Sequence, residues 1–355
     1  MSLAFISAAE ACADIANFDA VIDARSPAEF AEDHLPGAVN WPVLDDAERA
    51  RVGTLYVQVS ALEARKVGAA LVARNVAGHI EARVGAMPRE WRPLVYCWRG
   101  GQRSGSLAHI LGQIGFRTTQ LSGGYKGFRA VVRDELQALP QRHRFSVLCG
   151  RTGSGKTRLL QRLQQHGEQT LDLEGLAHHR GSILGEMPGL PQPTQKRFET
   201  RVWQALRGFD AARPVFVESE SARIGRLRVP EALLDRMHGD SRRVQVTMAD
   251  EARTLLLLDE YASHTADPEA FCKLLTALVD LQGRETVAGW QAQARAGEWP
   301  ALLADLMQRH YDPLYARSLQ RSYGSLAGAT TVDLGDAGPA ALDAAVGLVL
   351  GVACD

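Results

Sequence analysis

The chain has 355 residues, of which 46% are hydrophobic and 23% charged, and its formal net charge is −1 at pH 7. These values are typical of a globular enzyme with two or three domains, and they exclude a disordered, collagen-like or coiled-coil chain. Without a long apolar run, a basic leader or a CxxC pair among its five cysteines, the chain is expected in the cytoplasm, with no membrane insertion, disulfide framework or zinc site.

Residues 1–138 alternate short apolar runs with helical stretches. Ala20–Asp23 and Leu94–Cys97 predict buried strands, and Gln102–Ile114 predicts a helix because its apolar residues recur at helical spacing. Alternating strands and helices favour a parallel sheet. Residues 139–143 are the best candidate for a linker.

A second strand, glycine-rich turn and helix follow that linker. Arg144–Cys149 predicts the strand and Lys156–Gln165 the helix, and Val215–Val217 and Val244–Met248 predict further strands. The chain is strongly helical from Asp250 to about residue 319, and Gly335–Pro339 precedes a final apolar helix. The predicted fold class is α/β, with a parallel-sheet domain over 1–138, a phosphate-loop domain over 139–250, and a helical C-terminal extension over 251–355 packed on the second domain.

Cys97 stands between a predicted strand and a predicted helix, followed by a glycine pair. A helix N-terminus and a tight glycine turn aim backbone N–H groups at one point, and Arg99 and Arg103 add positive charge. Both effects favour the nucleophilic thiolate and stabilise a persulfide or perselenide on it, whereas a lone cysteine would more often be structural. Cys97, Arg99 and Arg103 are the predicted catalytic residues, and the rest of the anion loop is Trp98, Gly100, Gly101, Gln102 and Ser104.

The segment from Gly150 to Thr157 matches the phosphate-loop pattern G-x-x-x-x-G-K-[ST] between a strand and a helix. Its predicted diphosphate-binding residues are Gly150, Arg151, Thr152, Gly153, Ser154, Gly155, Lys156 and Thr157. Backbone amides and Lys156 would hold the diphosphate, and Thr157 would meet a bound Mg²⁺. Glu218, with Glu220 and Asp172 behind it, is the candidate acidic partner of Mg²⁺ or phosphate. The usual strand-end aspartate is absent, so ATP hydrolysis is not favoured, and no metal site made by the protein alone is expected.

The charge is unevenly distributed. Residues 141–228 hold 15 basic and 8 acidic side chains, whereas residues 229–355 hold 10 and 18. A basic middle segment is compatible with a polyanion on one face, and a solvated basic surface explains it equally well. The candidate contacts to RNA are His179, Arg180, Arg223, Arg226 and Arg228, of which the last three would share a helix face or line a loop.

The segments Asp23–Phe30, His34–Asn40 and Leu121–Tyr125 resemble the rhodanese domain over about residues 10–138. The resemblance implies an α/β domain that carries a chalcogen on Cys97, with Asp23 and Arg25 fixing the fold. The loop from Cys97 to Arg103 is one residue longer than in sulfurtransferase rhodaneses. A phosphorylated donor such as selenophosphate or thiophosphate, or a phosphoester, therefore fits better than thiosulfate.

The combination of this domain with a phosphate loop, Asp172–Ser182, Glu218–Ser221 and His310–Tyr315 resembles the bacterial tRNA 2-selenouridine synthase family. The resemblance implies that wobble 2-thiouridine in the tRNA anticodon loop becomes 2-selenouridine, with selenophosphate as donor. It also implies an S-geranyl intermediate made from geranyl diphosphate, and no tightly bound cofactor. We hypothesise that the phosphate loop grips geranyl diphosphate while Cys97 delivers selenium.

Two alternatives stay open at this point. A rhodanese-type sulfurtransferase or cysteine phosphatase with a regulatory nucleotide-binding domain would turn over thiosulfate or a phosphoester without tRNA. A non-enzymatic, nucleotide-gated anion sensor would have a Cys97 that resists alkylation at neutral pH, and would keep its function after Cys97→Ser.

Overall fold

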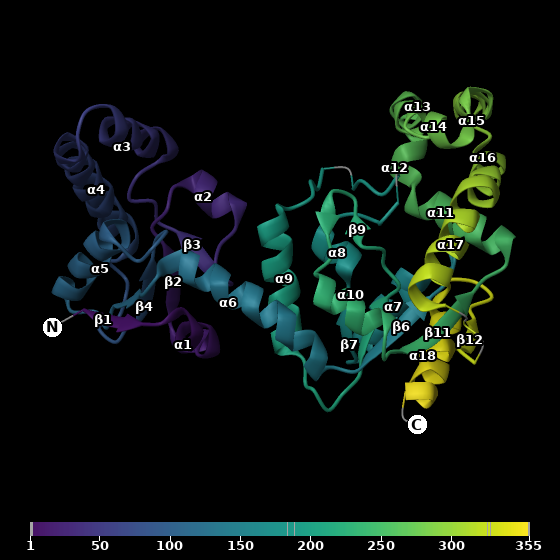
Figure 1. The fold of residues 1–355 in the computed structure, drawn as a ribbon, viewed down its shortest axis with the longest axis horizontal. Coiled ribbons are helices and arrows are strands. Elements are labelled where there is room, and N and C mark those ends of the chain that lie inside the picture. Colours follow the sequence, from purple (N-terminus) through teal and green to yellow (C-terminus); the bar gives the residue numbers. More distant parts are fainter. Residues whose placement is uncertain (1–2, 183, 188, 325, 327, 354–355) are drawn as a thin grey trace. The chain divides into compact units, whose positions relative to one another are not determined.

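The computed structural model describes residues 3–182, 184–187, 189–324, 326 and 328–353, and the fifth cysteine, Cys354, lies outside these ranges. The chain forms two compact units: residues 1–135 with 194–200, and residues 136–193 with 201–355. Each unit contains a five-stranded sheet whose paired strands all run parallel, which confirms the α/β class (Figure 1). Among the helices of these ranges, none combines the length and apolar character needed to cross a membrane.

The sheet of the first unit has the strand order β1-β5-β4-β2-β3. The predicted strands and helix are confirmed at β2, β4 and α5. Trp41 and Trp91 pack with Ile22, Val95 and Leu107 in the core beside Cys97. The elements are β1 Ala4–Ile6, α1 Ala8–Ala13, η1 Ile15–Asn17, β2 Ala20–Asp23, α2 Pro27–Glu32, β3 Ala38–Asn40, α3 Asp46–Gln58, α4 Ala61–Arg83, β4 Pro93–Tyr96, α5 Gln102–Ile114, β5 Thr119–Leu121 and α6 Gly124–Ala138.

The sheet of the second unit has the order β12-β11-β6-β8-β7, so the phosphate loop follows its central strand β6. The elements up to the last predicted central strand are η2 Leu139–Arg142, β6 Phe145–Cys149, α7 Lys156–Gln165, β7 Gln169–Leu171, α8 Leu173–Ala177, α9 Gln195–Gly208, β8 Val215–Glu218, β9 Arg223–Ile224, β10 Leu227–Arg228, α10 Glu231–His238 and β11 Arg242–Thr247. The predicted helix at 156–165 is confirmed, and the predicted strands at 144–149, 215–217 and 244–248 are confirmed to within two residues at either end.

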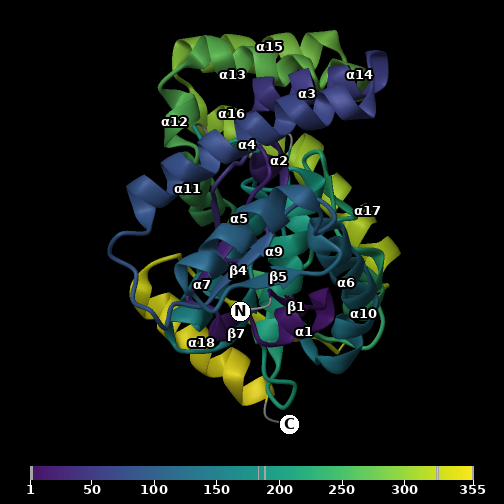
Figure 2. The same cartoon turned by 90° about the vertical axis from the view of Figure 1, so that its left-hand side faces the viewer.

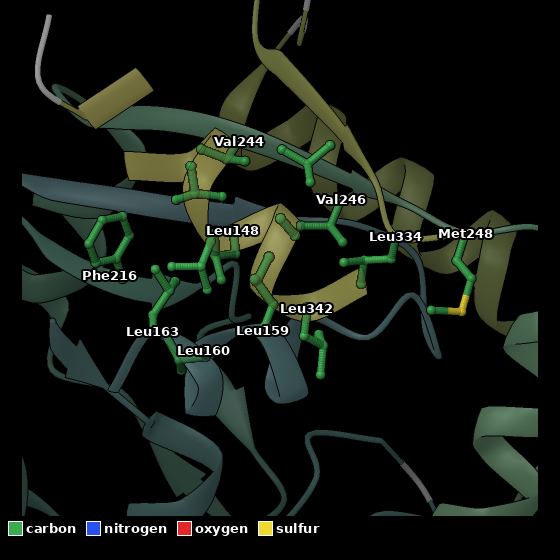
Figure 3. Close-up of a cluster of buried hydrophobic side chains, with 14 of the residues drawn as sticks. Leu148, Leu159, Leu160, Leu163, Phe216, Val244, Val246, Met248, Leu334 and Leu342 are labelled. Atoms are coloured by element: carbon green, nitrogen blue, oxygen red, sulfur yellow. The ribbon is translucent and has the colours of Figure 1, made fainter. Parts of the chain in front are cut away.

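The core of this sheet is a cluster of leucine, valine and phenylalanine side chains (Figure 3). Leu159, Leu160 and Leu163 recur at helical spacing on α7 and pack against Leu148 of β6 and Phe216 of β8. Burying each such side chain contributes about 1.5–3 kcal/mol. This packing holds the helix that begins at Lys156 firmly on the sheet.

Most of the remaining chain is helical, as predicted. The elements are α11 Asp250–Glu260, α12 Ala262–Thr265, α13 Pro268–Thr276, α14 Val279–Gln282, α15 Arg284–Ala296, α16 Trp299–Leu306, η3 Met307–Tyr311, α17 Asp312–Tyr323, β12 Thr330–Asp333 and α18 Pro339–Ala353. Helices α13 and α15 lie side by side (Figure 2) and bury Phe271 and Trp290 in a cluster of their own.

The predicted linker at 139–143 contains the turn η2, in which Leu139 and Pro140 are buried. Two expectations need correction. The region 251–355 is not purely helical, since β12 pairs with β11 and adds a strand to the second sheet. Arg223, Arg226 and Arg228 share no helix: Gly225, at φ +56°, turns the chain into the antiparallel hairpin β9–β10.

Candidate active site

Cys97 follows strand β4 and forms the floor of a shallow hollow on the first unit. Its side chain is only 3% exposed. The hollow is also lined by Trp98, Arg99, Gly101, Gln102 and Arg103. The predicted anion loop is therefore gathered around the sulfur, where α5 begins.

Two glycines outside the mouth of this hollow allow the loop to close. Gly100 has φ +67°, and a Cβ there would lie 2.4 Å from the carbonyl oxygen of Leu121. A Cβ on Gly124 would lie 2.3 Å from the carbonyl oxygen of Cys97. The amide of Tyr125 donates to that same oxygen at 2.8 Å. The start of α6 thus packs directly on the cysteine loop, which explains the Leu121–Tyr125 sequence in physical terms.

Ser104 and Gln120 form a chain of hydrogen bonds to the sulfur of Cys97. Ser104 Oγ lies 3.1 Å from Cys97 Sγ and donates to it, while Gln120 Nε2 donates to Ser104 Oγ at 3.0 Å. Gln120 Nε2 also donates to the carbonyl of Gly100 at 2.6 Å. Ser104 Oγ also lies 3.2 Å from the carbonyl oxygen of Gly101, so its hydroxyl lies between the sulfur and the loop backbone. Sequence reasoning did not find Gln120, because nothing in its local context on β5 marks it.

The two predicted arginines differ in their surroundings. Arg99 is exposed at the rim, whereas Arg103 Nη1 donates to Glu29 Oε2 at 2.6 Å. Burial pushes the pKa of Glu29 upward, but the hydrogen bond and charge of Arg103 outweigh it and hold the pKa below its ordinary value. The Ser26 amide also donates to Glu29, which sets the carboxylate at the first turn of α2. Glu29 therefore orients Arg103 and was missed as a site residue.

Asp23 and Arg25 form a fully buried ion pair with an N–O distance of 2.6 Å. Arg25 also donates to the carbonyl of Asp33, and its guanidinium carbon lies 3.9 Å from the ring centroid of Tyr125. These contacts place the pair inside the fold rather than in the hollow. Their role is structural, as predicted from the sequence.

The phosphate loop lies between β6 and α7. A Cβ on Gly150 would lie 2.4 Å from the carbonyl oxygen of Val246, and Gly153 and Gly155 have φ of +74° and +82°. These glycines are required for the loop to curl on the sheet. Lys156 Nζ donates to the carbonyl of Gly150 at 2.6 Å, so the cation lies over the loop where a diphosphate would sit.

A cavity of about 660 Å³ opens in front of this loop. Lys156 and Thr157 line it, and so do all three predicted acidic partners, Asp172, Glu218 and Glu220. Apolar and aromatic side chains complete the wall, including Met187, Leu257, Leu314, Leu319, Tyr261 and Tyr315. The cavity can therefore take a ligand with both a charged and an apolar part.

Among the acidic side chains of the cavity, Glu218 is buried, and Asp172, Glu174 and Glu220 are partly buried. Burial raises the pKa of Glu218 to about 7, although Lys156 and a hydrogen bond from Thr157 lower it. Burial and the charge of Glu218 raise the pKa of Glu220 to about 8. Burial together with Glu218 and Glu220 also raises the pKa of Glu174, which sequence reasoning did not select from its segment. Asp172 accepts from the amide of Gly175 and caps α8.

The oxygen donors here fit part of a magnesium shell. Glu218 is 4% exposed, and its Oε1 has no hydrogen-bond partner within the described chain. Carboxylate and hydroxyl oxygens suit Mg²⁺, which usually takes its remaining ligands from phosphate and water. In the part of the chain that the structure describes, no three His, Cys, Asp or Glu side chains converge to hold a metal by themselves.

A clamp from the C-terminal helices holds the phosphate loop. Arg253, only 1% exposed, donates to the carbonyl of Thr152 at 2.8 and 3.0 Å and to Asp312 at 2.6 Å. Asp312 also pairs with Arg151 at 3.0 Å. The Gly150 amide donates to Tyr315 Oη at 2.5 Å. The His310–Tyr315 motif thus supports the loop, a role that the sequence pattern alone did not reveal.

The candidate RNA contacts lie in three different settings. His179 is 5% exposed, and its ring lies near Gly185. Arg180 lines the cavity, donates to the carbonyl of Glu260 and lies 5.2 Å from the ring centroid of Tyr261. Arg223, Arg226 and Arg228 are exposed on the hairpin β9–β10.

Known proteins resemble this chain over most of its length. A family model described as the tRNA 2-selenouridine synthase AAA domain matches residues 143–276, and the rhodanese-like domain model matches residues 7–131. A tRNA 2-selenouridine synthase of Alcanivorax borkumensis is 36% identical over 346 residues, covering 86% of this chain and 91% of that protein. A protein of the same name from Aeromonas salmonicida is 33% identical, covering 84% and 87%. Another from a Shewanella species (strain MR-7) is 31% identical, covering 86% and 89%.

Proposed function

Because this chain belongs to the tRNA 2-selenouridine synthase family, we propose that it replaces sulfur with selenium at C2 of the wobble 2-thiouridine in tRNA. Selenophosphate is the donor, and the reaction passes through an S-geranyl intermediate made from geranyl diphosphate. The observation that carries the proposal is the cavity of about 660 Å³, which has a phosphate loop and an apolar wall in one site.

The order of steps follows from leaving-group chemistry. A thiocarbonyl sulfur leaves poorly, so the sulfur first attacks C1 of geranyl diphosphate. The C–S bond forms, the C1–O bond breaks with its electron pair on the diphosphate, and the base loses its N3 proton. Lys156 and the loop amides stabilise the departing diphosphate, and Leu257 and Leu314 offer contact to the prenyl chain.

Cys97 carries the selenium in the second step. The Cys97 thiolate attacks the selenium of selenophosphate, so that the S–Se bond forms and the Se–P bond breaks with its electron pair on phosphorus, which leaves at the phosphite level. The perselenide attacks C2 and expels geranyl thiolate, which leaves selenium bonded to both C2 and the Cys97 sulfur. One external thiol then attacks the Cys97 sulfur and frees the nucleoside as a selenolate, and a second thiol reduces the mixed disulfide and restores Cys97. The hydroxyl of Ser104 and the loop amides stabilise the anion on Cys97, and Arg99 and Arg103 attract the phosphorylated donor.

The phosphate loop with Thr157 and Glu218 would bind Mg²⁺ together with the diphosphate. The ion would supply charge neutralisation at the leaving group. We place the reaction in the cytoplasm, where reduced thiols and tRNA are both present.

Separable variants test the proposal. Cys97→Ala should abolish selenation but leave geranylation, whereas Lys156→Ala should abolish geranylation and so also selenation of 2-thiouridine. Selenation of a pre-geranylated tRNA should survive Lys156→Ala. The measurement is mass spectrometry of wobble nucleosides after incubation with tRNA, geranyl diphosphate and selenophosphate.

Geranyl transfer by Lys156→Ala at the wild-type rate would overturn the assignment of the phosphate loop. Turnover of thiosulfate or a phosphoester without any change in tRNA would instead favour a sulfurtransferase or cysteine phosphatase.

A further inference from the structure

A second hollow of about 610 Å³ adjoins the phosphate-loop cavity in the second unit. Arg223 and Arg226 of the hairpin line one side of it, and His178 and His179 line the other. Both hollows are lined by Gly181, Ser182 and Met187. The two hollows therefore adjoin at these residues, and we call the one beside the hairpin the hairpin groove.

The hairpin is held in a fixed position by Gln192. Its Oε1 accepts from the Arg226 amide at 3.0 Å, and its Nε2 donates to the carbonyl of Ile224 at 3.0 Å. A Cβ on Gly225 would lie 2.4 Å from Gln192 Oε1, so the turn and the amide fit closely. The two arginines are thus presented on a rigid support. The hydrogen bonds of Arg223 within the described residues are made by its backbone, to Ser221, and its guanidinium is exposed.

The two histidines of the hairpin groove differ. His178 Nε2 must accept from Arg201, since arginine can only donate, and its Nδ1 then donates to the carbonyl of Pro191. His179 is buried, and its Nδ1 has no partner among the described residues. An unpartnered buried polar atom costs about 1–3 kcal/mol, which a polar ligand or an ordered water would recover. Glu186 also lines the groove, and it is the one acidic side chain among the described residues of the lining.

We propose that the hairpin groove binds the single-stranded RNA loop that carries the target nucleotide, and that this nucleotide enters the phosphate-loop cavity past Gly181 and Met187. Arg223 and Arg226 contact backbone phosphates outside. The inference rests on the proposed function and adds where the RNA lies and how one base reaches the diphosphate.

The geometry favours this arrangement for two reasons. Guanidinium groups on a rigid support suit phosphate recognition, and single-stranded loops are recognised through bases that leave the stack. A single extruded nucleotide is the usual solution for chemistry on a base. The shared junction of the two hollows provides the passage.

The test is a fluorescence-anisotropy titration of the full chain with a labelled anticodon stem-loop that contains 2-thiouridine at the wobble position, at several salt concentrations. Replacing both Arg223 and Arg226 with alanine should weaken binding at least tenfold. It should also reduce the slope of log Kd against log salt by about 1–1.5, because each phosphate contact to a single strand contributes about 0.7. Arg223→Ala alone should give roughly half of that change in slope. This variant keeps Arg226, whose guanidinium donates to the carbonyl of Gln192 and so helps to hold the hairpin.

Arg142→Ala is the matched control, since Arg142 is an exposed arginine of the second unit that lies outside the lining of the groove. It should keep the wild-type affinity and slope, and all variants should bind inorganic pyrophosphate normally. Unchanged RNA affinity and slope in both arginine variants would overturn the groove assignment while leaving the proposed function intact. A wild-type chain that bound no RNA would overturn the proposed function itself.

The path of the nucleotide is tested separately with a photoreactive thiouridine at the wobble position and pyrophosphate present. Cross-links should form to the peptides that contain Ser182, Tyr261 or Tyr315, which line the cavity. Cross-links confined to the hairpin peptide would overturn the entry of the nucleotide into the cavity.

Discussion

The hydroxyl of Ser104 lies 3.1 Å from the sulfur of Cys97 and is itself held by Gln120. Sulfur, hydroxyl and amide form a short relay from the reactive atom to the buried strand β5. An ionised sulfur accepts this hydrogen bond, whereas a thiol gains less from it.

Replacing Ser104 with alanine should therefore slow alkylation of Cys97 by iodoacetamide about tenfold at pH 7, since a hydrogen bond to a charged group contributes about 1.5–3 kcal/mol. Ser106→Ala is the control, because Ser106 Oγ donates to the Gln102 carbonyl on the same helix. A rate for Ser104→Ala within twofold of wild type would contradict the relay.

Gly124→Ala should destabilise the first unit by more than about 2 kcal/mol. The new Cβ would lie 2.3 Å from the Cys97 carbonyl, and φ at this position is +53°. Chemical denaturation measures the effect. Gly112→Ala has open space at its Cβ in the last turn of α5, so it should gain up to about 0.5–1 kcal/mol from helix propensity. Equal stability of the two variants would show that α6 does not pack on the cysteine loop as described.

Asp312→Asn should lower both the stability of the second unit and its affinity for pyrophosphate. Arg253 loses its closest partner and keeps Asp250, so the expected cost is about 2–4 kcal/mol, and pyrophosphate binding should weaken about tenfold as the loop loosens. Asp343→Asn removes the exposed partner of Arg162 and should change neither quantity noticeably. Normal pyrophosphate binding by a destabilised Asp312→Asn would limit the clamp to a structural role.

The buried glutamates predict a pH-dependent stability of the second unit. Because burial holds the pKa of Glu218 at about 7 and of Glu220 at about 8, above the ordinary 4.5, the folded state binds more protons than the unfolded state between pH 4.5 and 8. The free energy of unfolding therefore falls as pH rises through this window, by up to about 1 kcal/mol per pH unit and group. Glu220→Gln should raise Tm at pH 8 more than at pH 5 in magnesium-free buffer.

The control for this pH experiment is Glu251→Gln, at an exposed position on α11. It should leave the pH profile of Tm unchanged. If Glu220→Gln raised Tm equally at both pH values, the two carboxyls would not be titrating as described.

Local sequence predicted the two loops well because each depends on neighbouring residues. The helices that follow Gly101 and Gly155 begin at Gln102 and Lys156, as the apolar spacing and the glycines indicated. The hairpin of Arg223 was missed, although its buried Ile224 and Leu227 alternate with exposed arginines around a glycine. This short alternation of buried and exposed residues predicts strands, whereas the spacing of the three arginines had suggested a helix face or a loop.

Residue spacing alone determined that the chain carries a cysteine loop and a phosphate-loop motif, each at the end of a parallel strand, since each motif is made by residues that are close in sequence. Only the tertiary structure decided that Glu29 orients Arg103, that Gln120 supports Ser104, and that Asp312 and Tyr315 brace a loop more than 150 residues away. The residues of each pair are far apart in the sequence and come together only when helices pack on the sheets. The local spacing of apolar residues therefore does not indicate which distant side chains will be in contact.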